Sequence, residues 1–138
     1  MENRINITVS EIAGRKRASS GSQWEPKMGY SRAVRAGNTI AVTGTVGINA
    51  DGKYPDSLEE QTRRSLAIIQ AAIESLGGKI EHVIRTRMFV TDVSKWEQVA
   101  KVHGEVFRDI RPATSILEVA KLIDPDAQIE IEADAIVP

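Results

Sequence analysis

Residues 57–76, SLEEQTRRSLAIIQAAIESL, carry the clearest helix signal of the chain. Ser57 stands before Glu59 and Glu60, as at a helix N-terminus, and the pair Gly77-Gly78 ends the pattern. The apolar residues recur near helical spacing, at Leu58, Leu66, Ile69, Ile73 and Leu76. The segment is therefore predicted to be a helix with one apolar face.

Strand patterns surround this helix. Two β-like runs at 30–37 and 38–48 meet at Gly37-Asn38, as in a hairpin, and residues 15–29 are interpreted as a loop anchored by Trp24. Further along, a strand is predicted at 82–93 and a helix at 94–110, where Ser94 and Glu97 have capping-box spacing. Two more strands are predicted at 114–121 and 128–137, around the Asp124-Pro125 turn. The order β-β-α-β-α-β-β predicts an α+β fold with a mixed sheet. All 138 residues are expected to form one domain, in which 1–28 supply an N-terminal strand and loop.

Two helices on one side of a mixed sheet leave its other face uncovered. Strict alternation places on the helix-covered face Ile40, Val42, Ile84, Met88, Val90, Leu117, Val119, Ile129, Ile131 and Ala133. It places on the opposite face Thr43, Arg85, Arg87, Phe89, Thr114, Ile116, Glu118, Glu130 and Glu132. Because this second face mixes aliphatic, aromatic and charged side chains, we expect it to pack against another subunit.

Composition excludes several classes of protein. A formal net charge of -1 gives no general basic field, so nucleic-acid binding is not expected, and the cluster Arg15–Arg17 is interpreted as a solvated loop. With no cysteine, the chain has no disulfide, thiolate metal site or Cys nucleophile, and a cytoplasmic location is expected. No segment approaches the roughly 18 apolar residues of a membrane span, so no membrane partner is expected. No zinc or phosphate-loop motif is present, and His82 and His103 are interpreted as surface or packing residues.

The acids of the last strand are the first candidates for chemistry. Glu130 lies in an otherwise apolar strand, where partial desolvation would let its carboxylate hold or activate a water. The alternative is a salt bridge to Arg85 or Arg87 across the sheet or a subunit interface. Tyr30 could hydrogen-bond a ligand or simply pack with its hydroxyl in water. Thr43-Gly44 could bind an anion or form a strand bulge.

Four segments together resemble the RidA/YjgF proteins, the reactive intermediate deaminase family. They are GYSRAVRAGNTIAVTG, QTRRSLAIIQAAIESLGG, RTRMFVTDVSKWEQV and the pair ILEVAKL and QIEIEADAIV, and the likeness runs from about residue 29 to the end. It implies a chorismate-mutase-like fold that assembles as a homotrimer around a central barrel, with ligand pockets between subunits. The mixed sheet face is what such a trimer would bury.

The resemblance also implies cofactor-free and metal-free hydrolysis of small imines and enamines such as 2-aminoacrylate. By position, Tyr30 matches the family's pocket tyrosine, Thr43 with Gly44 its pocket serine, and Glu130 its water-positioning glutamate. Thr114 stands where the family has the arginine that clamps the substrate carboxylate, and Ile116 where a cysteine is common. A threonine cannot supply that planar, permanently charged fork. Arg32 or Arg111 could reach the pocket instead, or each could be an ordinary surface or interface charge.

Three functions follow. The first is a hydrolase of a small reactive imine or enamine, with Glu130 and a water performing the reaction and Tyr30, Thr43 and Thr114 shaping the pocket. The second is a non-catalytic homotrimer that binds a small metabolite in the same cleft. The third, from the family's older description, is an endoribonuclease or translation inhibitor, which the aromatic content of 4% disfavours. Glu130 is predicted to point into the intersubunit cleft, and Glu132 and Asp134 to pair with interface arginines or reach solvent.

Overall fold

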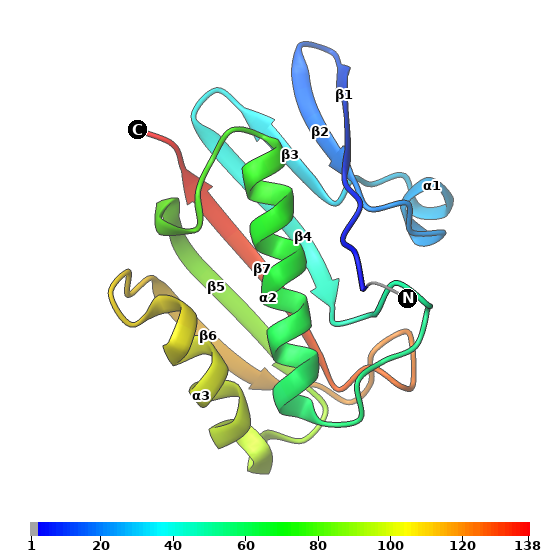
Figure 1. Ribbon diagram of the computed structural model, residues 1–138, viewed down its shortest axis with the longest axis vertical. Helices are drawn as coiled ribbons and strands as arrows, with labels where there is room; N and C mark the ends of the chain where they lie inside the picture. Colours follow the sequence, from blue (N-terminus) through cyan, green and yellow to red (C-terminus); the bar gives the residue numbers. More distant parts are fainter. Residues whose placement is uncertain (1–2) are drawn as a thin grey trace.

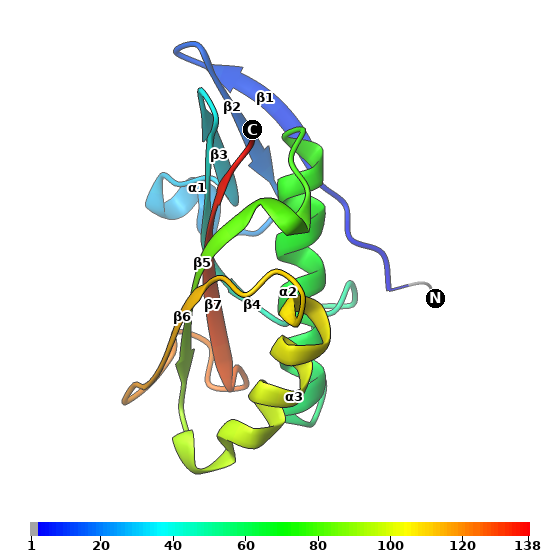
Figure 2. The same cartoon turned by 90° about the vertical axis from the view of Figure 1, so that its left-hand side faces the viewer.

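The chain forms one seven-stranded sheet with two long helices on one side, as a computed structural model that describes residues 3–138 shows (Figures 1 and 2). The strands are β1 (Thr8–Ile12), β2 (Arg15–Ser19), β3 (Ala33–Ala36), β4 (Thr39–Val46), β5 (Val83–Val90), β6 (Ala113–Glu118) and β7 (Ile129–Ile136). The helices are α1 (Trp24–Met28), α2 (Leu58–Ser75) and α3 (Trp96–Phe107), with 3₁₀ turns at η1 (Ile80–His82) and η2 (Val93–Lys95). The predicted α+β class is confirmed.

The sheet is mixed, as predicted. Its strand order is β1-β2-β3-β4-β7-β5-β6, and every neighbouring pair is antiparallel except β5 and β6, which are parallel. α3 lies in the crossover between these two parallel strands, since they cannot be joined by a tight turn. The last strand, β7, therefore lies in the middle of the sheet between β4 and β5. Its apolar side chains from Ile129 to Ala135 are buried, and its acids lie on the opposite face.

The long helix α2 forms as its sequence predicts. The Ser57 hydroxyl accepts a hydrogen bond from the backbone N–H of Glu60 at 3.1 Å, and the helix ends just before Gly77, whose φ of 85° suits glycine. The capping box expected at Ser94 and Glu97 is wrong. Asp92 accepts from the Ser94 backbone N–H instead, a 3₁₀ turn intervenes, and α3 begins only at Trp96.

The N-terminal region differs from its prediction. Residues 15–29, expected to be a loop, contain strand β2 and helix α1, and β1 pairs with β2 in a hairpin. The turn residues Ala13 and Gly14 both have positive φ, as in a tight type I′ connection. The basic cluster Arg15–Arg17 is thus part of a strand. β1 is exposed along its whole length, so no apolar alternation marks the hairpin in the sequence.

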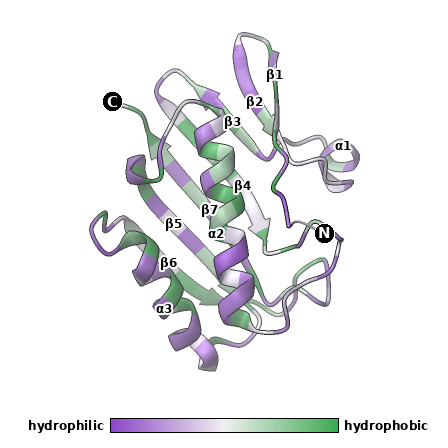
Figure 3. Ribbon diagram, viewed as in Figure 1, coloured by the Kyte–Doolittle hydropathy of each residue, from purple (hydrophilic) through white to green (hydrophobic). Residues whose placement is uncertain are grey.

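The predicted alternation holds for the central strands, where Figure 3 shows it as purple and green bands along β5 and β7. It fails in two places. A register irregularity between Val83 and Arg85 buries Val83 and leaves Ile84 52% exposed. On β6 the phase is reversed: Leu117 is 49% exposed, whereas Ile116 packs against the core.

Thr114 and Ile116 therefore lie on the helix-covered face, not on the face of Glu130. In the parallel pairing of β5 with β6 their partners are Thr86 and Met88, both buried under the helices, and paired residues share one face. Among the helices of residues 3–138, none has the length and apolar composition that a bilayer-spanning helix requires.

Candidate functional site

A β-bulge in β4 creates the centre of the site. Val42 pairs with Ala133 and Thr45 pairs with Ile131, so Thr43 and Gly44 together lie opposite a single residue of β7. The bulge was one of the two interpretations of Thr43-Gly44, and the register confirms it. A Cβ atom at Gly44 would lie 2.8 Å from both Cδ and Oε2 of Glu130. Only glycine therefore lets the Glu130 carboxylate lie directly against this strand.

The Glu130 carboxylate lies in a cleft of about 530 Å³. Four predicted site residues line this cleft together: Tyr30, Arg32, Gly44 and Glu130. Sequence reasoning missed several other residues that line it, including Trp24, Tyr54, Arg64 and Asp124. They come from segments interpreted as loops or from the polar side of α2, where no periodic signal indicates a shared site.

The three acids of β7 have different partners. Along the pairing with β5, Asp134 lies opposite Arg85, Glu132 opposite Arg87, and Glu130 opposite Phe89. The Arg87 guanidinium lies 3.1 Å from Asp134 and 3.7 Å from Glu132, so these acids pair with an arginine of their own chain. The salt bridge from Glu130 to Arg85 or Arg87 across the sheet of its own chain is not formed, and within residues 3–138 the Glu130 carboxylate has no ion pair.

Burial controls the ionisation of Glu130. Desolvation and the nearby charge of Glu132 raise the pKa of this carboxyl above its usual value, while the charge of Arg32 acts in the opposite direction. A carboxyl with a raised pKa and no ion-pair partner can accept a proton from a bound water at neutral pH more readily than an ordinary glutamate.

Tyr54 adds a neutral hydroxyl to the cleft. Burial, and next the charge of Asp124 and the hydrogen bond to it, raise the pKa of Tyr54 above its ordinary value. The phenol is therefore protonated throughout the physiological range and can act only as a hydrogen-bonding group there.

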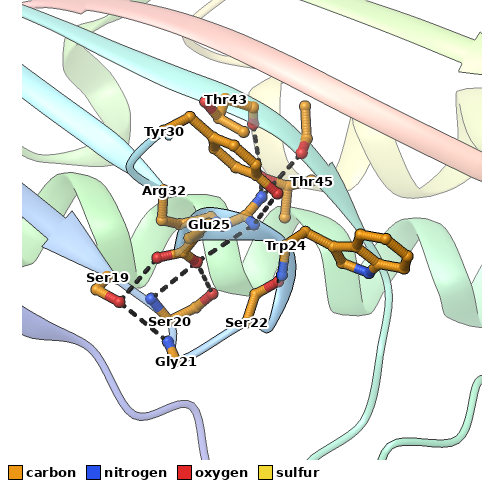
Figure 4. Close-up of polar contacts among 11 residues, drawn as sticks. Ser19, Ser20, Gly21, Ser22, Trp24, Glu25, Tyr30, Arg32, Thr43 and Thr45 are labelled. Carbon is orange, nitrogen blue, oxygen red and sulfur yellow. Dashed lines mark hydrogen bonds and ion pairs between the residues drawn. The ribbon is translucent and has the colours of Figure 1, made fainter. Parts of the chain in front are cut away.

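A buried polar network forms one side of the cleft (Figure 4). Arg32 is 6% exposed, which excludes the alternative of an ordinary surface charge. Its Nη2 lies 3.4 Å from Glu25 Oε2 and donates to the Tyr30 hydroxyl at 3.4 Å. Its Nη1 donates to the Gly44 carbonyl at 2.8 Å and to Thr45 Oγ1 at 3.3 Å.

Glu25 was not among the predicted site residues. It is 5% exposed and accepts hydrogen bonds from the hydroxyls of Ser19 at 2.7 Å and Ser20 at 2.6 Å. Burial alone would raise the pKa of Glu25, but the hydrogen bonds from Ser20 and Ser19 and the charge of Arg32 outweigh it, and the pKa lies below its usual value. Glu25 is therefore a buried carboxylate anion.

Other predicted site residues lie elsewhere. Thr43 lines a neighbouring open hollow on the uncovered sheet face, which it shares with Tyr30 and Arg87. Thr114 and Ile116 face the helices, where the Thr114 hydroxyl lies 2.7 Å from that of Thr86. Arg111 is exposed at the end of α3 and donates from Nε to the Arg108 carbonyl. Thr114, Ile116 and Arg111 of the described chain do not line the cleft.

Both histidines make local contacts. His103 Nε2 lies 2.9 Å from the Thr86 hydroxyl and its ring packs on Phe107, and burial lowers the pKa of this imidazole. His82 Nδ1 accepts from the Lys79 backbone N–H at 3.0 Å. No three His, Asp or Glu side chains in residues 3–138 are grouped as metal ligands would be.

The sequence and fold of the whole chain match those of known proteins. The family described as Endoribonuclease L-PSP matches residues 21–137, nearly the whole chain. The chain belongs to this family. The resemblance to the RidA/YjgF proteins is thereby confirmed, since these names describe the same group of relatives.

Several relatives cover most of the chain. The 2-iminobutanoate/2-iminopropanoate deaminase of Escherichia coli is 33% identical over 111 residues, which is 78% of this chain and 86% of that protein. A Mycobacterium tuberculosis member of the YjgF/YER057c/UK114 family has a crystal structure that superimposes with a TM-score of 0.83 at 45% identity, covering 89% of this chain and 99% of that one. The structure of Escherichia coli TdcF with bound serine gives a TM-score of 0.74 at 26% identity, covering 79% of this chain and 88% of that one.

Proposed function

We propose that the chain is a cofactor-free hydrolase of a small imine or enamine. An enamine first becomes its imine tautomer, water adds to the C=N carbon, and the resulting carbinolamine loses ammonia to leave a carbonyl compound. Glu130 carries one proton from the attacking water to the imine nitrogen and then a second from the carbinolamine hydroxyl to the departing amine, acting each time as a general base and then as a general acid. Tyr30 and Tyr54 supply hydroxyl groups that orient the substrate.

The observation that carries this proposal is the environment of Glu130. Its carboxylate is held in a cleft against Gly44, has Phe89 rather than an arginine opposite it, and has a raised pKa. Family membership supports the same reaction class, since one relative is named as an imine deaminase.

Two of the residues considered for holding a substrate carboxylate, Thr114 and Arg32, are not placed to do so. Thr114 carries no charge and faces the helices, while Arg32 directs its Nη groups at acceptors of its own chain. We therefore expect Arg111 of a second subunit, rather than Thr114, to complete the pocket, and only in an assembly.

A homotrimer is the assembly we propose. The sheet face opposite α2 and α3 is uncovered (Figure 2) and carries the exposed Leu117 beside Phe89 and the Arg87 ion pairs. A second layer packed on that face would bury this apolar surface and enclose the open hollow next to Tyr30. Sedimentation or light scattering of the purified chain tests this assembly directly.

The hydrolase proposal is tested with 2-aminoacrylate generated in situ by a serine or threonine dehydratase. The rate of pyruvate appearance is compared with and without the protein, beside a Glu130→Gln variant, and the assay is repeated with a cyclic imine that has no carboxylate. Acceleration that Glu130→Gln abolishes supports the proposal. Equal rates with wild type, variant and buffer on both substrates would reject it.

A non-catalytic metabolite-binding protein is the second candidate. It is favoured by the same lack of a carboxylate clamp at Thr114. Calorimetric titration of small amino and imino compounds separates the two functions, because a binder takes up ligand without any turnover that Glu130→Gln could remove.

A further inference from the structure

Glu25 holds Tyr30 in two ways. Its backbone carbonyl accepts from the Tyr30 N–H at 2.9 Å across the end of α1, where Gly29 adopts a φ of 74°. Its carboxylate holds the Arg32 guanidinium, which in turn donates to the Tyr30 hydroxyl. Residue 25 therefore determines where both ends of the tyrosine lie.

The Nη groups of Arg32 all donate within the protein. A guanidinium has five N–H groups, and the four on Nη1 and Nη2 are directed at Gly44, Thr45, Glu25 and Tyr30. The fifth, on Nε, is buried and has no partner within residues 3–138. An arginine that leaves a buried donor unsatisfied is poorly explained as a stabilising device, because unpaired buried donors are costly.

The arginine also reaches Glu130 through the backbone. Arg32 fixes the Gly44 carbonyl at 2.8 Å, and the Glu130 carboxylate lies against the Cα of that same glycine. The bulge thus has the arginine network on one side and the candidate catalytic acid on the other.

We propose that Glu25 and Arg32 are a positioning pair for this cleft, which fix the Tyr30 hydroxyl and the Gly44 backbone, and through Gly44 the Glu130 carboxylate, without binding substrate themselves. The proposal rests on the function proposed above only for its kinetic readout. It assigns Arg32, expected to bind substrate, a role behind the cleft, and it gives Glu25 a role in the site.

The pair also acts on the charge of Glu130. The other titratable and charged groups near this carboxylate are Glu132 on its own strand and, around the cleft, Arg4, Tyr54, Arg64 and Asp124. Arg32 lowers the pKa of Glu130. Neutralising Glu25 should strengthen that influence, and removing Arg32 should abolish it, so the two changes should move the titration of Glu130 in opposite directions.

The test uses Glu25→Gln, Arg32→Met and the double variant in the full chain. Arg35→Met is the matched control, because Arg35 also donates to two backbone carbonyls, those of Gly37 and Leu76, but lies outside the cleft. The first readout is the ¹³C carboxyl titration of Glu130, assigned with Glu130→Gln. The second is kcat against KM for imine hydrolysis, with thermal unfolding measured in parallel.

Glu25→Gln should shift the Glu130 midpoint down and Arg32→Met should shift it up, while the double variant should follow Arg32→Met and Arg35→Met should stay near wild type. kcat should fall about 10- to 100-fold in Arg32→Met and in the double variant, since Tyr30 and Gly44 lose the Arg32 donor in both, and less in Glu25→Gln, where Arg32 remains but is no longer held by a carboxylate. An unchanged Glu130 titration in both single variants, or wild-type kcat in the double variant, would overturn the proposal. Opposite shifts without any hydrolysis would keep the positioning pair and reject the hydrolase.

Discussion

Gly44→Ala tests whether the bulge places the candidate catalytic acid. The new methyl group would lie 2.8 Å from Glu130 Cδ and Oε2 and 3.1 Å from Cγ, whereas an ordinary contact is at least 3.4 Å. The Glu130 carboxyl group must therefore move by about 0.6 Å or more. It can do so because it is the end of a flexible side chain, at a cost of about 1 kcal/mol for an off-rotamer torsion.

Activity should respond far more than stability. Misplacing a reacting group by about 1 Å can cost roughly 100-fold in rate, so we expect kcat of Gly44→Ala to fall about 10- to 100-fold. The φ of Gly44 is not positive, so the alanine backbone itself is not strained. The assay is pyruvate release from 2-aminoacrylate, beside thermal unfolding of the same samples.

Gly104→Ala is the matched control. Gly104 lies within α3 and a Cβ there meets nothing within 4 Å, so the alanine should stabilise the helix by up to about 1 kcal/mol and leave turnover unchanged. Wild-type kcat in Gly44→Ala would refute the reasoning, because it would mean that the contact between Gly44 and Glu130 does not set the position of the acid.

Three further variants test the environment of Glu130 and the packing beside it. Because burial raises the pKa of Glu130, the unfolded chain loses this proton first, and stability is lost as pH rises from the unfolded pKa of about 4.3 through the higher folded pKa. Glu130→Gln should therefore gain unfolding free energy over wild type as pH rises above about 4, measured by denaturant titration. Phe89→Arg would place a cation directly opposite Glu130, so the ¹³C titration of that carboxyl should move down and hydrolysis should fall; an unshifted midpoint would contradict the register. Gly47→Ala should lower the unfolding free energy by about 2 kcal/mol or more, because its Cβ would overlap the Gln61 carbonyl of α2, and a wild-type melting temperature would contradict this contact.

The sequence predicts those elements in which one face is buried and the other is not. α2 and β7 were predicted correctly because their apolar periods are complete. An N-terminal strand was expected, but its partner β2 was taken for a loop because the hairpin they form carries no apolar alternation. β6 was given the wrong phase because Ile116 and Leu117 are adjacent and equally apolar. The pairing of Glu25 with Arg32 depends on how α1 packs against the sheet, and this packing cannot be predicted from the sequence pattern around either residue.

The three acids of β7 have a common origin and different consequences. Burying Ile129 and Ile131 under the helices necessarily sends the alternating acids to the other face. Asp134 and Glu132 lie opposite Arg85 and Arg87, so their charges face cations across the sheet. Glu130 instead lies opposite Phe89 on one side and against the bulge at Gly44 on the other. A partly buried carboxylate without a cation lowers stability, and such conflicts between local chemistry and fold are concentrated at functional sites. Glu130 is the acid of β7 that lies opposite no arginine, and this is the strongest structural reason to place the chemistry there.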